Sequence, residues 1–112
     1  MTHAIRVHAY GGPEVLQWEE VEIGPPGPGD VRIKQAAVGL NYIDVYQRSG
    51  LYPVPLPGSI GLEAAGVVEE VGAGIGDLKV GDRVAYAGGP AGAYAEERVM
   101  PAAPLVKLPD GI

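Results

Sequence analysis

Short strands that end in turns rich in glycine and proline are the main pattern along this chain. In "HAIRVHAY", residues 3–10, apolar and polar positions alternate, so that Ile5 and Val7 lie on one face of a predicted strand. The segment "GPPGPGD" is predicted to be a loop, because its prolines and glycines fit neither a strand nor a helix interior. The predicted strands are "HAIRVHAY", "VLQWEEVEI", "DVRIKQAAVGL", "AAGVVEEVGAG" and "DRVAYA". Their order predicts an all-β domain, built as a small barrel with open ends.

One short helix is predicted within "VGLNYIDVYQRSGLYP", over residues 41–49. Asn41 is a good N-cap, and Asp44 lies three residues later, where its carboxylate can complete a capping box. Gly50 can end the helix in the left-handed conformation. The expected fold is therefore a partly open β-barrel with one or two short helices.

Four polar side chains in and after this helix, Asn41, Asp44, Tyr46 and Tyr52, leave two interpretations open. Asn41 can cap the helix, bind a ligand or do both, and Asp44 can support the helix start or contact a cofactor. Tyr46, which shares a helix face with Tyr42, can pack against the barrel or line a pocket. Tyr52 lies in a proline-rich loop and has less reason to belong to a core. The cluster is either a capped and packed helix or one wall of a pocket.

Composition and charge narrow the classes of protein. The chain has 112 residues, enough for one domain with a single core. A formal net charge of -6 with only 8 lysines and arginines argues against nucleic acid as a partner. No apolar run is long enough for a membrane helix or a signal peptide, so a cytoplasmic protein is expected. The absence of cysteine excludes disulfides, a thiol nucleophile and a thiolate-bound metal.

Several motifs resemble those of a known family. "GLEAAGVVEEVGAGI" followed by "LKVGDRV" resembles the signature of the medium-chain dehydrogenase/reductase superfamily, in its GroES-like domain. "VGLNYIDVYQRSGLYP", with "YGGPEVL" near the start, is similar to the zinc-free quinone oxidoreductase branch, which includes zeta-crystallin. The resemblance implies that residues 1–112 are the GroES-like catalytic domain of a longer NADPH-dependent quinone oxidoreductase. It also implies a small-molecule quinone or enone as the substrate and a homodimer as the full-length protein.

The same resemblance implies roles for the polar cluster: Asn41, Tyr46 and Tyr52 as catalytic residues, and Asn41, Asp44 and Tyr46 as cofactor-binding residues. Hydride transfer from a nicotinamide turns a quinone into a phenolate-like product, and the hydroxyls of Tyr46 and Tyr52 can stabilise its developing charge. The Asn41 amide offers a donor and an acceptor, which suits the orientation of a nicotinamide carboxamide or a substrate carbonyl.

No metal site is expected. The zinc-dependent relatives have Gly-His-Glu where residues 61–63 of this chain read Gly-Leu-Glu, and a cysteine ligand near the position of Asn41. His3 and His8 are five residues apart on one predicted strand, so they point to opposite faces and cannot converge on one ion. Glu63 is then expected to make a structural hydrogen bond or ion pair near the pocket wall.

Two glycine-rich segments are interpreted as turns rather than as phosphate-binding loops. "GAGIGD" has the spacing G-x-G-x-G rather than G-x-G-x-x-G and precedes no apolar helix, and "YAGGPAGAYAE" resembles a loop that leads into a last strand. With no dinucleotide fingerprint, and with the ending "VKLPDGI", the chain is expected to lack the Rossmann domain that would hold most of the NADPH. The 112-residue chain alone is therefore expected to be inactive.

Two other functions are compatible with the sequence. Zinc-free relatives also reduce enones and enoyl thioesters, and the sequence does not choose between these substrates and a quinone. A protein of another class, a stand-alone GroES-like scaffold or co-chaperonin, would have a related fold. Against it, no long flexible loop carries an exposed apolar tripeptide, and size-exclusion chromatography would distinguish a ring from a severed reductase domain.

Overall fold

The computed structural model describes residues 2–112 and consists mainly of β-strands. These residues form seven strands, one α-helix and one short 3-10 helix. The elements in chain order are β1 (Thr2–Val7), the 3-10 helix (Pro13–Val15), β2 (Leu16–Val21), β3 (Asp30–Val38), α1 (Tyr42–Ser49), β4 (Glu63–Val71), β5 (Arg83–Ala87), β6 (Glu97–Pro101) and β7 (Val106–Lys107). The predicted fold class, mostly strands with one or two short helices, is confirmed.

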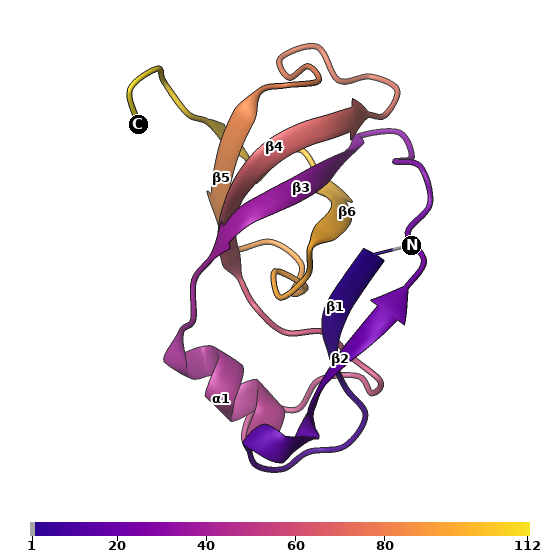
Figure 1. Ribbon diagram of the computed structural model, residues 1–112, viewed down its shortest axis with the longest axis vertical. Helices are drawn as coiled ribbons and strands as arrows, with labels where there is room; N and C mark the ends of the chain where they lie inside the picture. The colour runs from indigo at the N-terminus through magenta and orange to yellow at the C-terminus, as the bar shows by residue number, and fades with distance from the viewer. Residues whose placement is uncertain (1) are drawn as a thin grey trace.

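The strands form two antiparallel sheets. Five strands pair in the order β6-β3-β4-β5-β7, and β1 pairs with β2 in a separate two-stranded sheet. Figure 1 shows β3, β4 and β5 side by side in the upper half of the molecule, with β1, β2 and α1 below them. The helix is inserted between two neighbouring strands, because α1 follows the end of β3 and precedes the start of β4.

The core lies on one face of the larger sheet, since buried and more exposed positions alternate along its strands. Val31 and Ile33 of β3 have no exposed surface, whereas Arg32 between them is only partly buried. The core cluster consists of Val31, Ile33, Ala64, Val68, Leu78, Val84, Tyr86, Ala93 and Met100. β3 is also paired with β4 up to Val38 and Ala64, next to the connection that contains the helix.

The smaller sheet is connected to the loops around the helix by backbone hydrogen bonds from β1. The N–H of Ile5 donates to the carbonyl of Tyr94 over 2.7 Å. Val7 and Gly58 exchange two hydrogen bonds, each of 2.9 Å. The loop before β4 and the loop before β6 are therefore both held against β1.

Some element boundaries differ from the sequence prediction. The first strand ends at Val7 rather than at residue 10. Tyr10 therefore lies in the loop after β1, where its hydroxyl donates to the carbonyl of Val54 over 2.8 Å. The glycine-rich loop leads into a strand, β6, as predicted, but β6 is not the last strand, because β7 follows it. β7 was not predicted, because two residues are too few for an alternating pattern to appear. The segments 72–77 and 88–96 contain no helix, as predicted.

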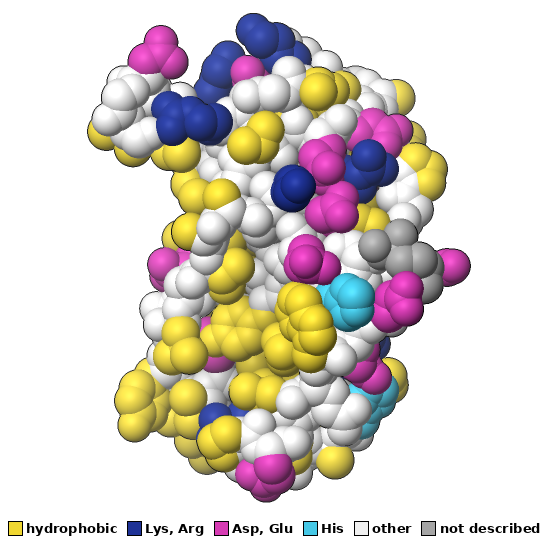
Figure 2. Space-filling view, in the orientation of Figure 1, with side chains coloured by type: hydrophobic (Ala, Val, Ile, Leu, Met, Phe, Trp, Pro, Cys, Tyr) yellow, Lys and Arg dark blue, Asp and Glu magenta, His cyan; other side chains and the backbone are white. Residues whose placement is uncertain are grey.

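Hydrophobic side chains gather on the lower half of the molecule, over the region of α1 and the smaller sheet, as Figure 2 shows. The exposed apolar residues around the helix are Leu40, Tyr42, Leu51, Tyr52 and Leu56. Lysine and arginine side chains lie mainly towards the top of the same view. Within residues 2–112, no helix is long and apolar enough to cross a membrane.

Candidate active site

A capping box formed by Asn41 and Asp44 starts α1. Asn41 is the N-cap residue in an extended conformation, and its backbone N–H donates to Oδ2 of Asp44 over 3.0 Å. Gly50 ends the helix with a φ of 88°, in the left-handed region that glycine enters without a steric penalty. The predicted start and end of the helix are confirmed.

The side-chain amide of Asn41 is held by the first residue of β4. Its Nδ2 donates to Oε2 of Glu63 over 2.8 Å. Gly39 makes this contact sterically accessible, because a Cβ added at Gly39 would lie 2.2 Å from Oε1 of Glu63. The structural hydrogen bond predicted for Glu63 is therefore present, and it fixes one of the residues assigned to catalysis.

Asp44 is turned into the protein, with 2% of its surface exposed. Its Oδ2 accepts a second hydrogen bond, of 2.6 Å, from the hydroxyl of Tyr94. Burial, together with the hydrogen bond to Asp44 and the charge of that carboxylate, raises the pKa of the Tyr94 hydroxyl, which therefore stays protonated and donating. This geometry favours the helix-supporting interpretation of Asp44 over direct contact with a cofactor.

Tyr94 was missed by the sequence analysis. It lies in the glycine-rich loop before β6, which the sequence identified only as a turn. Gly61 makes room for its ring, since a Cβ there would lie 2.6 Å from Cδ1 of Tyr94, and the φ of Gly61 is +101°. No local pattern relates Tyr94 to Asp44, fifty positions earlier, so only the fold reveals the pair.

Tyr46 lies between two other tyrosine rings. Its ring centroid is 5.4 Å from that of Tyr42 in a tilted arrangement and 5.2 Å from that of Tyr52 in an edge-on arrangement. The N–H of Tyr52 donates to the carbonyl of Tyr46 over 3.1 Å, so the loop after the helix folds back onto it, as predicted. Tyr52 remains 51% exposed and Tyr42 72% exposed. Of the tyrosines assigned to the site, Tyr46 is packed and Tyr52 is accessible.

The structure does not place all of the assigned residues in one hollow. A hollow of about 450 Å³ is lined by Asn41, Ile43, Leu62, Glu63, Ala87 and Gly88. Neither Tyr46 nor Tyr52 is among its lining residues. Asn41 and the tyrosine pair therefore lie on neighbouring surfaces around α1, and their convergence on one ligand stays a prediction.

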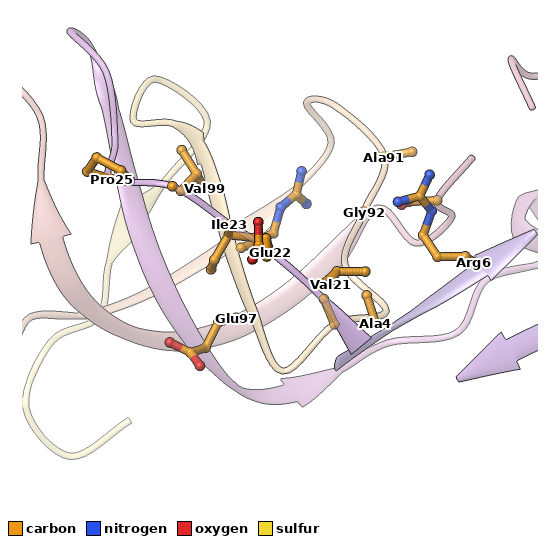
Figure 3. Close-up of a pocket in the computed structure, with 14 residues that line it drawn as sticks. Ala4, Arg6, Val21, Glu22, Ile23, Pro25, Ala91, Gly92, Glu97 and Val99 are labelled. Carbon is orange, nitrogen blue, oxygen red and sulfur yellow. The ribbon is translucent and has the colours of Figure 1, made fainter. Parts of the chain in front are cut away.

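A second pocket, of about 330 Å³, lies beyond β1, away from the residues assigned to the site. Figure 3 shows Arg6 on one side of this pocket, with Glu22 and Glu97 towards the other. Arg98, which also lines it, is buried and occupied, because it donates to the hydroxyl of Tyr86 over 3.2 Å and to the carbonyl of Pro90 over 2.9 Å. Charges of both signs line the pocket, so it has no evident preference for an anion or a cation.

The two histidines have separate partners. The ring of His3 stacks on that of Trp18 at 5.3 Å, and Nε2 of His8 lies 2.7 Å from Oε1 of Glu19. Among residues 2–112, no group of three or more histidine, aspartate or glutamate side chains is arranged to hold a metal ion. The donor set of these residues therefore does not fit a zinc site.

We expect the purified protein to contain no stoichiometric zinc, and chelators to leave its fold and any full-length activity unchanged. The reason is the ligand set: a zinc site needs three or four converging nitrogen, sulfur or carboxylate donors. Elemental analysis of the protein before and after dialysis against a chelator measures this. One zinc per chain before dialysis would contradict it.

The sequence and the structure of this chain are both similar to those of known proteins. The model of the alcohol dehydrogenase GroES-like domain matches residues 27–110. A quinone oxidoreductase of Pseudomonas aeruginosa is 55% identical over 100% of this chain and 35% of its own length. A 2-haloacrylate reductase of Burkholderia is 48% identical over 97% of this chain and 34% of its own length. The solved structure of Escherichia coli quinone oxidoreductase complexed with NADPH superposes with a TM-score of 0.95 at 44% identity, covering 98% of this chain and 34% of that one.

The chain thus spans about a third of the length of the relatives that it matches. The family match covers most of the chain, including α1 and every strand of the larger sheet. The resemblance to the quinone oxidoreductase branch of the medium-chain dehydrogenase/reductase superfamily is confirmed. The chain belongs to the alcohol dehydrogenase GroES-like domain family.

Proposed function

We propose that this chain is the catalytic domain of a longer NADPH-dependent quinone oxidoreductase, with its site on the surface around α1. The observation that carries the proposal is the accessible tyrosine Tyr52, which packs edge-on against Tyr46, on a surface that neighbours the Asn41 amide held by Glu63. The relatives named quinone oxidoreductase support the same assignment. The exposed apolar side chains around the helix provide a surface suited to a flat aromatic substrate.

The proposed division of roles follows from the chemistry of the side chains. NADPH, bound mainly by a second domain, would supply a hydride to the quinone. The hydroxyls of Tyr52 and Tyr46 would donate hydrogen bonds to the carbonyl oxygen on which negative charge develops. Asn41 would orient a carboxamide or carbonyl group, because Glu63 restricts the rotation of its amide. A solvent proton completes the conversion of quinone, NADPH and H⁺ to hydroquinone and NADP⁺.

A second candidate substrate is an α,β-unsaturated carbonyl compound. The 2-haloacrylate reductase of Burkholderia, at 48% identity, favours this candidate. Hydride addition to such a compound also places negative charge on a carbonyl oxygen, so the same donors would serve both substrates.

The test of the proposed function is an assay of the full-length protein with NADPH against a benzoquinone and a 2-haloacrylate. We expect NADPH oxidation with the quinone to have the higher kcat/KM. A preference for the haloacrylate would select the second candidate. NADPH oxidation with neither substrate would overturn both.

Replacing Asn41 separates its two roles. Asn41→Ala removes the N-cap and the amide, so the free energy of unfolding should fall by about 1 kcal/mol and the KM for cofactor or quinone should rise. Asn41→Ser keeps a capping side chain and removes only the bond to Glu63, so KM should rise with little change in stability. Urea unfolding and steady-state kinetics of the full-length protein measure both effects. Wild-type KM values for Asn41→Ser would show that the asparagine only caps the helix.

A further inference from the structure

Three hydrogen bonds connect residues from three parts of the chain at the start of α1. The hydroxyl of Tyr94 and the backbone N–H of Asn41 both donate to Oδ2 of Asp44, over 2.6 Å and 3.0 Å. The side-chain amide of the same Asn41 donates to Oε2 of Glu63 over 2.8 Å. Asn41 is thus fixed at its backbone by one carboxylate and at its side chain by another.

The carboxylate of Asp44 depends on these two donors. A buried carboxylate is costly unless hydrogen bonds replace its water. Its other oxygen, Oδ1, is buried and has no hydrogen-bond partner within residues 2–112. Loss of the Tyr94 hydroxyl would therefore leave the backbone N–H of Asn41 as the remaining donor to this carboxylate.

Asp44 and Tyr94 are badly placed to act on a ligand themselves. Asp44 is 2% exposed, and neither residue lines the hollow beside Asn41. Any effect that they have on the reaction must pass through a residue that does reach the hollow. Asn41 is that residue, because it bonds Asp44 directly and lines the hollow.

We propose that Tyr94 and Asp44 are positioning residues, which set the orientation of the Asn41 amide for the reaction. This inference rests on the proposed function, because it takes Asn41 as a residue that contacts substrate or cofactor. The Tyr94 hydroxyl fixes the Asp44 carboxylate, the carboxylate fixes the backbone of Asn41, and Glu63 then receives the amide in one orientation.

The test is a double-mutant cycle in the full-length protein, with Tyr94→Phe and Asn41→Ser. Tyr94→Phe keeps the ring that packs on Gly61 and removes only the hydroxyl, so we expect kcat/KM to fall about tenfold. In the Asn41→Ser background the same change should have no further effect, because the amide that it positions is absent. An equal loss in both backgrounds, or no loss in the wild-type background, would overturn the proposal.

A matched control is Tyr86→Phe, which removes another buried tyrosine hydroxyl bonded to side chains, those of Gln35 and Arg98. It should lower the unfolding midpoint and leave kcat/KM unchanged. A loss of kcat/KM equal to that of Tyr94→Phe would show a general effect of destabilisation and overturn the proposal. If Tyr94→Phe does not fold, Asp44→Asn replaces it in the cycle, with the same expected non-additivity.

A crystal structure of the full-length Tyr94→Phe protein distinguishes failure of this inference from failure of the proposed function. We expect the contact between Nδ2 of Asn41 and Oε2 of Glu63, 2.8 Å here, to be lost or reoriented. If the wild-type protein reduces neither substrate, the proposed function fails, and the expected effect of Tyr94→Phe on kcat/KM fails with it. An unmoved amide in the variant would overturn the positioning role whatever the activity.

Discussion

Replacing Tyr52 by Phe in the full-length enzyme should lower kcat by roughly ten- to a thousandfold with a quinone substrate. The change removes one hydroxyl and keeps the ring that packs edge-on against Tyr46 at 5.2 Å. A donor that bonds the substrate oxygen mainly as its charge develops contributes to the transition state more than to substrate binding, so KM should change little. Stopped-flow measurement of NADPH oxidation in a single turnover reports the hydride-transfer step directly.

Tyr42→Phe is the matched control for this prediction. Tyr42 contacts the same Tyr46 ring, at 5.4 Å, but it is 72% exposed and has no assigned role in the reaction. Its hydroxyl should be dispensable, with a single-turnover rate within about twofold of the wild-type rate. Equal rates for the wild type, Tyr42→Phe and Tyr52→Phe would mean that the tyrosines only pack the helix.

The second large effect is on stability, at Gly72 in the turn after β4. A Cβ added there would lie 1.9 Å from the carbonyl oxygen of Gly27 and 2.8 Å from that of Asp30. Both are backbone atoms, one in the loop before β3 and one in the first residue of β3, and neither can rotate away as a side chain could. Gly72→Ala should therefore lower the free energy of unfolding by about 3 kcal/mol, as for a strongly overpacked site. Urea unfolding followed by circular dichroism measures the loss.

Gly76→Ala tests whether this loss arises from the steric clash. No heavy atom lies within 4 Å of a Cβ added at Gly76, in the same connection between β4 and β5. The free energy of unfolding of Gly76→Ala should stay within about 0.5 kcal/mol of the wild-type value. Similar midpoints for the two alanine variants would contradict the predicted clash.

The parts of the fold that the sequence predicted are those set by neighbours along the chain. Local patterns predicted a strand in each of the segments that form β1 to β5, and the spacing of Asn41, Asp44 and Gly50 predicted both ends of α1. These features depend on residues two to nine positions apart. Local backbone preference and one buried face are sufficient to specify them.

The parts that the sequence did not predict depend on distant residues. The sequence indicated a structural partner for Glu63 but not that the partner is the amide of Asn41, which follows the end of β3 and bonds the first residue of β4. Tyr94 is fifty positions from Asp44, and no periodicity connects a loop tyrosine to a helix start. β1 also ends earlier than predicted, because its pairing with β2 stops at Val7 and Leu16, and the alternation within one strand does not show where its partner strand begins.

The loop that carries Tyr94 also determines when during folding the candidate site can form. Its contacts join positions far apart in the chain, including Tyr94 with Asp44, Gln35 with Ala93, and His3 with Glu96. Contacts of this kind form late, because the entropy of closing a long loop is lost before the contact contributes any stability. A nascent chain that has formed α1 and the β3–β4 pair would still leave the Asp44 carboxylate without its tyrosine, until the segment around residue 94 has been synthesised and has docked.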